Sequence, residues 1–227
     1  RDDVESRGLG DVYKRQVLKD NRAVLVKVCG LTDTVEADYL NKNKVDFAGF
    51  VLFFPKSKRN ISIEKAEQIM AELDENIKKV AVIVSPDESE IQQINGSGFD
   101  YVQIHGEIKD RLLEQISKPV FKAFNIKDIK NIHKYQNNAK IVGYVFDAAV
   151  PGSGKVFDWS ILNDIKRDAK TFILAGGLND SNVREAVKLV NPDVVDVSSG
   201  VEYDSGSGKD PEKIKQFIRQ LEINNKI

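Results

Sequence analysis

The sequence predicts one α/β domain folded as a single (β/α)8 (TIM) barrel, and two observations support this. Eight short runs rich in β-branched and aromatic residues alternate with segments whose apolar residues recur at helical spacing. Several of these runs are apolar on both sides of the strand alternation, which is typical of parallel strands covered by helices. An open doubly wound sheet is the structural alternative. The first run, however, is not followed by the Gly-x-Gly-x-x-Gly pattern of dinucleotide-binding sheets.

The expected strands are short and evenly distributed along the chain. In chain order they are Val24–Val28, Phe47–Phe53, Lys79–Val84, Tyr101–Ile104, Val120–Phe124, Ile141–Phe146, Thr171–Leu174 and Val194–Val197. Eight strand–helix units in about 210 residues correspond to the short end of the barrel fold.

The expected helices between these strands show apolar faces of different strength. The clearest are Ile63–Leu73, Asp180–Val190 and Lys209–Ile223, in which apolar residues recur three and four positions apart. Asn179, Asp180 and Ser181 are candidate N-caps of the second. Lys127–Tyr135 has the weakest helical pattern.

The first sixteen residues have neither periodicity nor an apolar face. The part Asp11–Gln16 matches the translation of a transposase adapter used in sequencing libraries. We therefore expect residues 1–16 to be a non-native segment and residues 17–227 to form the single catalytic domain. A disordered native extension is the alternative interpretation.

Composition excludes several classes of protein. The 227 residues carry 34 Lys and Arg against 35 Asp and Glu, a net charge of −1, so no nucleic acid or anionic membrane is expected as a partner. One cysteine and two histidines argue against a metal site built from several of these residues. No apolar run approaches the roughly 20 residues of a membrane helix, and no signal peptide is visible. We expect a cytoplasmic protein, whose oligomeric state, monomer or homodimer, stays open.

Reactive and small residues follow the expected strands, at the end where a parallel barrel builds its active site. In chain order they are Cys29, Gly30, Arg59, His105, Asp147, Gly176, Gly177, Ser199 and Gly200. Each also has a purely structural interpretation. A lone cysteine is often a small buried hydrophobe, and an aspartate after a strand often binds loop amides.

The ordered set of motifs is highly specific. Val26–Thr32, Pro55–Arg59, Gln103–Gly106, Pro151–Trp159, Leu174–Leu178 and Asp196–Glu202 resemble, in this order, phosphoribosylanthranilate isomerase of tryptophan biosynthesis. The resemblance extends from about Val24 to the C-terminus. Lys58 stands where the family usually has proline, and Ser153 where glycine is common.

The resemblance implies an Amadori rearrangement of a small phosphorylated substrate, with no cofactor and no metal. N-(5-phosphoribosyl)anthranilate would become 1-(2-carboxyphenylamino)-1-deoxyribulose 5-phosphate. By this resemblance Cys29 is the base and Asp147 the acid, Arg59 binds the anthranilate carboxylate and His105 lines the site. Phosphate would be held by the pairs Gly176–Gly177 and Ser199–Gly200. Pro151–Gly154 would be a mobile lid over the acid.

Two other functions compete with this one. Another phosphate-binding barrel sugar isomerase of the histidine-pathway type would need aspartates after the first and fifth strands, where Cys29 and Ala123–Phe124 stand. A non-catalytic ligand-binding relative would have lost Cys29, Asp147 or the glycine pairs, and all are present.

Strand periodicity gives one further expectation, inside the barrel. Lys27 shares a strand face with Cys29, and Asp196 shares one with Ser198. The first and eighth strands of a closed barrel are neighbours. If these faces point inward, two opposite charges meet in a dry interior, so we predict a Lys27–Asp196 ion pair.

Overall fold

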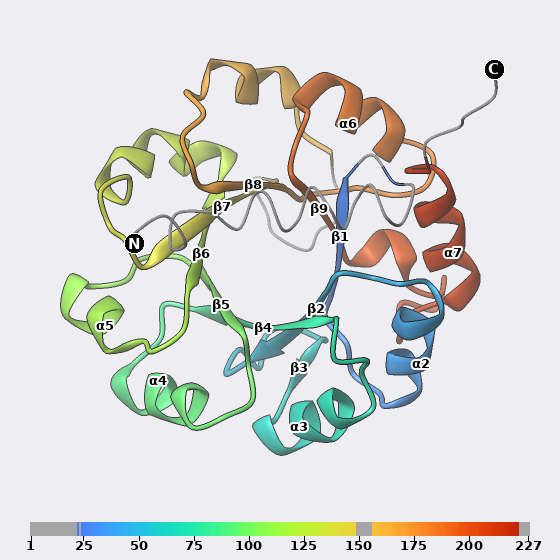
Figure 1. The fold of residues 1–227 in the computed structure, drawn as a ribbon, viewed down its shortest axis with the longest axis horizontal. Helices are drawn as coiled ribbons and strands as arrows, with labels where there is room; N and C mark the ends of the chain where they lie inside the picture. The colour runs from blue at the N-terminus through green and yellow to red at the C-terminus, as the bar shows by residue number, and fades with distance from the viewer. Residues whose placement is uncertain (1–21, 23, 149–155, 223–227) are drawn as a thin grey trace, which may run out of the picture.

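The computed structural model describes residue 22 and residues 24–148 and 156–222. The segment 1–16 and the expected lid Pro151–Gly154 lie outside these residues. The described strands form one parallel sheet of nine in the order β1-β9-β8-β7-β6-β5-β4-β2-β3, which closes through β1–β2 pairing (Figure 1). Eight of the strands make the barrel, and the two-residue β3 pairs in parallel with Val51 and Leu52 at the end of β2. The predicted barrel fold is confirmed.

The observed strands agree with the expected ones to within one residue at each end, apart from the additional β3. They are β1 Leu25–Cys29, β2 Phe47–Leu52, β3 Asn60–Ile61, β4 Lys78–Val84, β5 Tyr101–His105, β6 Val120–Asn125, β7 Ile141–Asp147, β8 Thr171–Leu174 and β9 Val194–Val197. Phe53 ends β2 because its backbone has a positive φ of 56°, which no strand can continue.

Helices follow the strands and surround the barrel (Figure 1). The α-helices are α2 Val35–Lys42, α3 Ile63–Ala71, α4 Glu88–Asn95, α5 Asp110–Gln115, α6 Val183–Val190 and α7 Pro211–Arg219. The 3₁₀-helices are η1 Ile126–Lys134, η2 Trp159–Asp164 and η3 Ser199–Val201. None of the helices in the described part of the chain has both the length and the apolar character needed to cross a bilayer.

Side-chain caps decide where several helices begin. Asp87 and Glu90 form a reciprocal capping box at α4. At α7 the Asp210 side chain accepts hydrogen bonds from the amides of Glu212 and Lys213, with Pro211 as the first helical residue. The predicted start of α6 was wrong, because this helix begins at Val183, after Asn179, Asp180 and Ser181 form a turn of their own. The weakly patterned segment around Lys127–Tyr135 is a 3₁₀-helix, η1.

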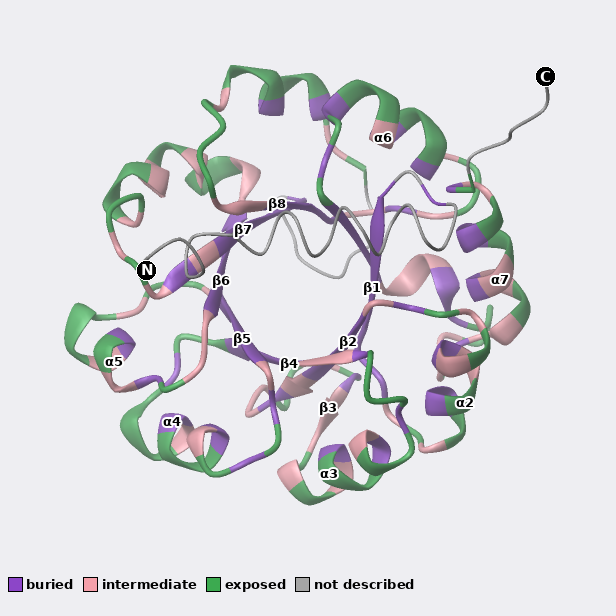
Figure 2. Cartoon of the chain, in the orientation of Figure 1, coloured by how far each residue is buried: buried purple, intermediate pink, exposed green. Residues whose placement is uncertain are grey.

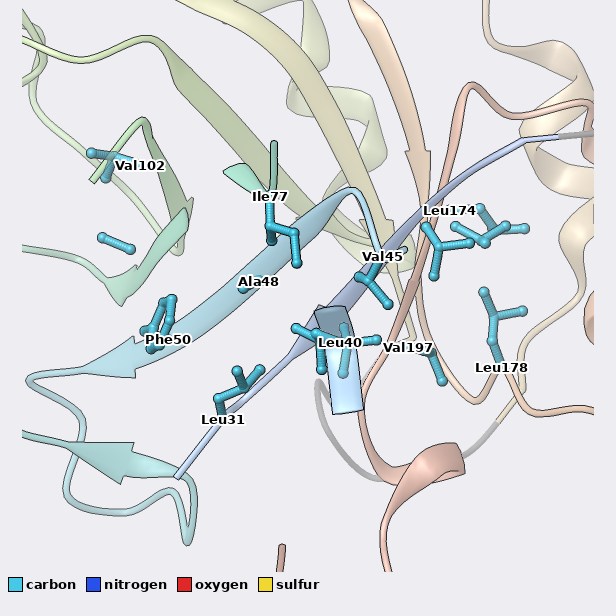
Figure 3. Close-up of a cluster of buried hydrophobic side chains, with 14 of the residues drawn as sticks. Leu31, Leu40, Val45, Ala48, Phe50, Ile77, Val102, Leu174, Leu178 and Val197 are labelled. Carbon is cyan, nitrogen blue, oxygen red and sulfur yellow. The ribbon is translucent and has the colours of Figure 1, made fainter. Parts of the chain in front are cut away.

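Two apolar layers make the core. The strands are buried, and the helices are buried only on the side facing them (Figure 2). Between strands and helices lies the larger layer, part of which is drawn in Figure 3, including Leu40, Phe50 and Leu174. The barrel interior is a separate, smaller cluster of residues that alternate with the first along each strand. It contains Leu25, Cys29, Phe47, Val80, Val82, Tyr101, Phe121, Ala123, Val145, Ile173, Ala175 and Val194.

Candidate active site

Cys29 is the last residue of β1 and faces the barrel interior. It is 9% exposed, and its thiol packs so closely on Gly49 of β2 that a Cβ there would lie 2.9 Å from the sulfur. Burial raises the pKa of this thiol, while the Lys27 ammonium opposes that rise. Burial has the larger effect, so the neighbouring cation does not by itself create a thiolate.

The predicted ion pair beneath the thiol is confirmed. Lys27 Nζ donates a hydrogen bond of 2.6 Å to Asp196 Oδ2, and the two side chains are 0% and 6% exposed. The two residues are register partners on β1 and β9. Asp196 raises the pKa of Lys27 by charge attraction and hydrogen bonding, against the desolvation that burial imposes.

Asp147 is the last residue of β7 and shares the inward face with Val145. Its Oδ1 accepts a hydrogen bond of 2.7 Å from the amide of Ala148. Burial raises the pKa of this carboxyl to about 6, with a smaller contribution from Asp196. Gly176 passes close by: a Cβ at this residue would lie 3.0 Å from Asp147 Oδ1 and 2.6 Å from the Ala148 amide nitrogen. Asp147 can therefore be both protonated and ionised near neutral pH.

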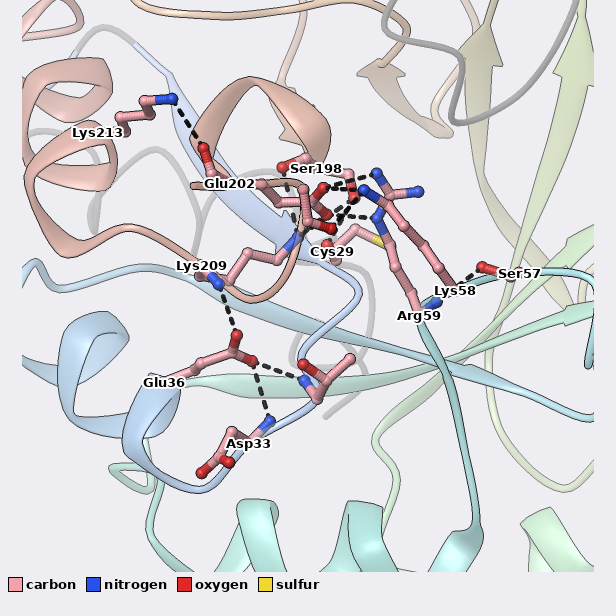
Figure 4. A network of polar contacts seen from close by, with 12 residues as sticks. Cys29, Asp33, Glu36, Ser57, Lys58, Arg59, Ser198, Glu202, Lys209 and Lys213 are labelled. Carbon is pink, nitrogen blue, oxygen red and sulfur yellow. Dashed lines mark hydrogen bonds and ion pairs between the residues drawn. The ribbon is translucent and has the colours of Figure 1, made fainter. Parts of the chain in front are cut away.

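Arg59 lies in the loop after the carboxyl end of β2, directly before β3, and is almost buried, at 9% exposed. Its aliphatic stem lies flat on Gly30, where any Cβ would overlap with Arg59 Cδ and where φ is +81°. This contact brings Arg59 next to Cys29. Its guanidinium pairs with Glu202, through Nε at 2.5 Å and Nη2 at 3.1 Å (Figure 4).

His105 ends β5 and is partly exposed. Its Nε2 lies 2.9 Å from Nε2 of Gln103, so the ring nitrogen accepts a hydrogen bond in this arrangement. Burial and the positive charges of Lys122 and Lys27 lower the pKa of His105 to about 3. The ring is therefore neutral near pH 7, suited to hydrogen bonding rather than to charge pairing.

The two expected phosphate loops are adjacent, because β8 and β9 are paired. Gly176 and Gly177 have φ values of +88° and +69°, a conformation that glycine adopts readily. In the next loop Ser199 begins η3, and Gly200 packs so tightly against the Leu178 carbonyl that a Cβ would overlap with it. Both loops follow the carboxyl ends of their strands.

Sequence reasoning missed a buried group of charges beside Arg59. Glu202, after η3, is 4% exposed and Lys209 is 1% exposed, and they pair at 3.0 Å. Lys58, whose side chain is 53% exposed, joins them from the solvent side and donates to Glu202 at 2.8 Å and to the Gly206 carbonyl at 2.7 Å. Nothing in the local sequence distinguishes these residues from surface charges. The partner of Lys58, for example, lies 144 positions away along the chain.

A cavity at this rim is lined by Gly30, Thr32, Lys58, Arg59, Glu202 and residues 206–208. Among the residues that the structure describes, no group of three or more His, Cys, Asp or Glu side chains is arranged to hold a metal ion. The site thus offers proton-transfer groups, cations and backbone amides.

The family model described as N-(5'-phosphoribosyl)anthranilate (PRA) isomerase matches residues 26–220. The chain belongs to the phosphoribosylanthranilate isomerase family. The N-(5'-phosphoribosyl)anthranilate isomerase of Listeria monocytogenes serotype 4b (strain CLIP80459) is 41% identical over 200 residues, 86% of this chain and 97% of that protein. The family resemblance stated from the sequence is confirmed.

Solved structures of phosphoribosylanthranilate isomerases have the same fold. One shows monomers generated from the dimeric enzyme of Thermotoga maritima, with a TM-score of 0.76, 35% identity and coverage of 87% of this chain and 98% of that chain. Another holds reduced 1-(o-carboxyphenylamino)-1-deoxyribulose 5-phosphate, with a TM-score of 0.75, 35% identity and the same coverage.

Proposed function

We propose that this chain isomerises N-(5'-phosphoribosyl)anthranilate to 1-(2-carboxyphenylamino)-1-deoxyribulose 5-phosphate in tryptophan biosynthesis. The observation that carries this proposal is the pair of proton-transfer groups at the rim. Cys29 and Asp147 end β1 and β7, and both face the barrel axis. The charges of Lys27 and Asp196 affect the pKa of both groups. Membership of the family supplies the substrate.

Asp147 acts first in the proposed reaction, as the general acid. Its carboxyl proton goes to the furanose ring oxygen as the bond from that oxygen to C1 breaks, which leaves an iminium ion. A carboxyl whose pKa is about 6 retains a proton in a useful fraction of molecules at neutral pH. The carboxylate that remains accepts the Ala148 amide hydrogen bond and is stabilised by Lys27.

Cys29 then acts as the general base. As thiolate it removes the proton from C2, and the electron pair of that C–H bond forms the enolamine, which tautomerises to the ketone. The pKa of Cys29 is raised by burial, so the thiolate is a minority species whose charge Lys27 and Lys209 stabilise. The active state of the pair combines a thiolate with a protonated Asp147.

Binding groups surround this pair. Arg59 carries the guanidinium that would bind the anthranilate carboxylate in a bidentate way. The loops Gly176–Gly177 and Ser199–Gly200 would bind the phosphate through backbone amides, with neutral His105 lining the site. A solved relative that holds reduced 1-(o-carboxyphenylamino)-1-deoxyribulose 5-phosphate supports a phosphorylated ligand with a carboxylate for this site.

Three further parts of the proposal concern the whole protein. Residues 17–227 form the catalytic domain and residues 1–16 are dispensable, which fits a family match that begins at residue 26. The protein is cytoplasmic, and either a monomer or a homodimer. Deleting residues 1–16 should leave turnover and melting temperature unchanged, and a marked loss of either contradicts this part.

The activity itself is tested on the purified full chain. Substrate is generated in situ from anthranilate and phosphoribosyl pyrophosphate, and its anthranilate fluorescence is followed. We expect enzyme-dependent loss of fluorescence with saturation kinetics. Fluorescence that decays no faster than without the chain contradicts the proposed function.

A further inference from the structure

Glu202 has an unusual concentration of positive charge around one buried carboxylate. Its Oε1 accepts from Arg59 Nε at 2.5 Å and from Lys209 Nζ at 3.0 Å, and its Oε2 accepts from Arg59 Nη2 at 3.1 Å and Lys58 Nζ at 2.8 Å. These partners lower the pKa of Glu202 to about 2 in spite of its burial. The carboxylate is therefore ionised at every pH at which the enzyme would work.

The pairing uses only one edge of the Arg59 guanidinium. Glu202 occupies the side formed by Nε and Nη2, so the end formed by Nη1 and Nη2 still has hydrogen-bond donors. Within residues 22, 24–148 and 156–222, no side chain or carbonyl accepts from Nη1. Gly30 fixes the stem of Arg59 and Glu202 fixes its head, so the direction of the remaining edge is set from two sides.

Glu202 also connects Arg59 with the expected phosphate loop. Lys209 Nζ, which binds Glu202, contacts both the carbonyl and the hydroxyl of Ser198 at 3.3 Å. The Ser198 hydroxyl in turn donates a hydrogen bond of 2.8 Å to the carbonyl of Cys29. Figure 4 shows this chain of contacts running between the three loops.

We propose that Glu202 is a positioning residue of the isomerase, which holds the Nη1–Nη2 edge of Arg59 in the direction of the substrate carboxylate. This rests on the proposed function. Glu202 does not touch the substrate and acts through Arg59. The competing view is that Glu202 only anchors its loop by pairing with three cations, of which Arg59 and Lys209 are buried. That view predicts the same effect on ligands with and without a carboxylate.

The test substitutes Glu202→Gln and compares two competitive ligands. The amide keeps the shape but turns one acceptor oxygen into a donor that faces cations. Inhibition by reduced 1-(o-carboxyphenylamino)-1-deoxyribulose 5-phosphate, which has a carboxylate, should weaken by about ten-fold, the effect of one charged hydrogen bond. Inhibition by ribose 5-phosphate, which lacks it, should change less than about two-fold. KM should rise more than kcat falls.

Two further variants separate positioning from folding. Glu202→Asp keeps the charge but shortens the reach, so it should fold and show the same selective loss. Asp204→Asn removes an exposed carboxylate of the same loop, paired with Lys213, and should change neither ligand. In an Arg59→Lys background, Glu202→Gln should add little further loss, because both substitutions remove one interaction.

Equal weakening of both ligands, additive effects of Arg59→Lys and Glu202→Gln, or unchanged inhibition in a folded variant would each overturn the inference. If the wild-type chain is active, any of these results in the variants contradicts only the role of Glu202 and not the proposed function. A wild-type chain without isomerase activity would instead contradict the proposed function.

Discussion

Lys27 and Asp196 join the first and last strands of the barrel by a buried ion pair of 2.6 Å. They are register partners on β1 and β9, the seam at which the barrel closes. Each charge lies in a dry interior that would penalise it strongly on its own. The pair therefore fixes the register of the two strands that carry Cys29 and the phosphate loop.

Removing one partner of this pair should destabilise the fold strongly. Lys27→Met leaves Asp196 buried and uncompensated, and we expect a loss of about 3–5 kcal/mol in the free energy of unfolding. Urea denaturation at pH 7 measures it. The matched control is Lys42→Met, which breaks an exposed pair with Asp38 and should cost about 0.5 kcal/mol or less. Equal, small losses in both variants would show that the buried pair is unimportant for stability.

Asp147 should make the folded protein less stable at neutral pH than an uncharged isostere does. The pKa of Asp147 is about 6 in the folded state against an ordinary 3.8, so the carboxyl ionises more easily in the unfolded chain. At pH values above both pKa values this difference lowers the free energy of unfolding by about 3 kcal/mol. Asp147→Asn, which keeps the oxygen that accepts from Ala148, should therefore raise the melting temperature at pH 8.

This gain should shrink as pH falls from 6 to below 4, where the wild-type carboxyl is protonated in both states. Asp164→Asn, at an exposed position, should show no such trend. An Asp147→Asn protein that is less stable than wild type at pH 8 would contradict the raised pKa.

The pH dependence of kcat/KM should be bell-shaped. The acid limb should lie at about 6, where Asp147 titrates, and the alkaline limb at the raised pKa of Cys29. The active state is the minority form, with a thiolate and a protonated Asp147. The apparent pKa values of the two limbs therefore describe the Cys29–Asp147 pair and not either residue alone.

His105→Asn serves as the control, because the pKa of His105 is about 3 and its titration lies outside this range. Both limbs should stay in place in this variant, whatever happens to KM. Activity that rises through a single transition and never falls would contradict the two-group assignment.

The Arg59 guanidinium should matter through its geometry as well as its charge. Arg59→Ala should raise KM by more than Arg59→Lys does, because lysine keeps the charge but loses the fork that pairs with Glu202. Arg111→Ala removes an exposed arginine paired with Glu88 and should leave KM unchanged. Unaltered KM and kcat in both Arg59 variants would make Arg59 a structural residue only.

The sequence predicted the barrel and its seam because both depend on simple periodicities. Alternation along β1 and β9 placed Lys27 and Asp196 on one face, and closure made the strands neighbours. Four strands extend one residue beyond their apolar runs, to Cys29, His105, Asn125 and Asp147. Hydrophobicity could not place these ends, because the residues there are reactive or polar and face the barrel mouth.

The Glu202 group was beyond the reach of sequence patterns. Arg59 and Glu202 lie 143 positions apart, and neither loop has a period that reports its burial. The start of α6 was misplaced for a related reason. Three consecutive residues with capping side chains, from Asn179 to Ser181, fit a turn as well as a helix start, and a turn with its own hydrogen bonds forms there.

The most direct test of the account is turnover by Cys29→Ala and Asp147→Asn in the fluorescence assay, with circular dichroism to verify folding. Each substitution removes one proton-transfer group, so each should lower kcat at least about 10²–10⁴-fold. The double variant should lose little more, because the two groups act in one reaction. Near-native turnover by either folded single variant would contradict the assignment of Cys29 as base and Asp147 as acid.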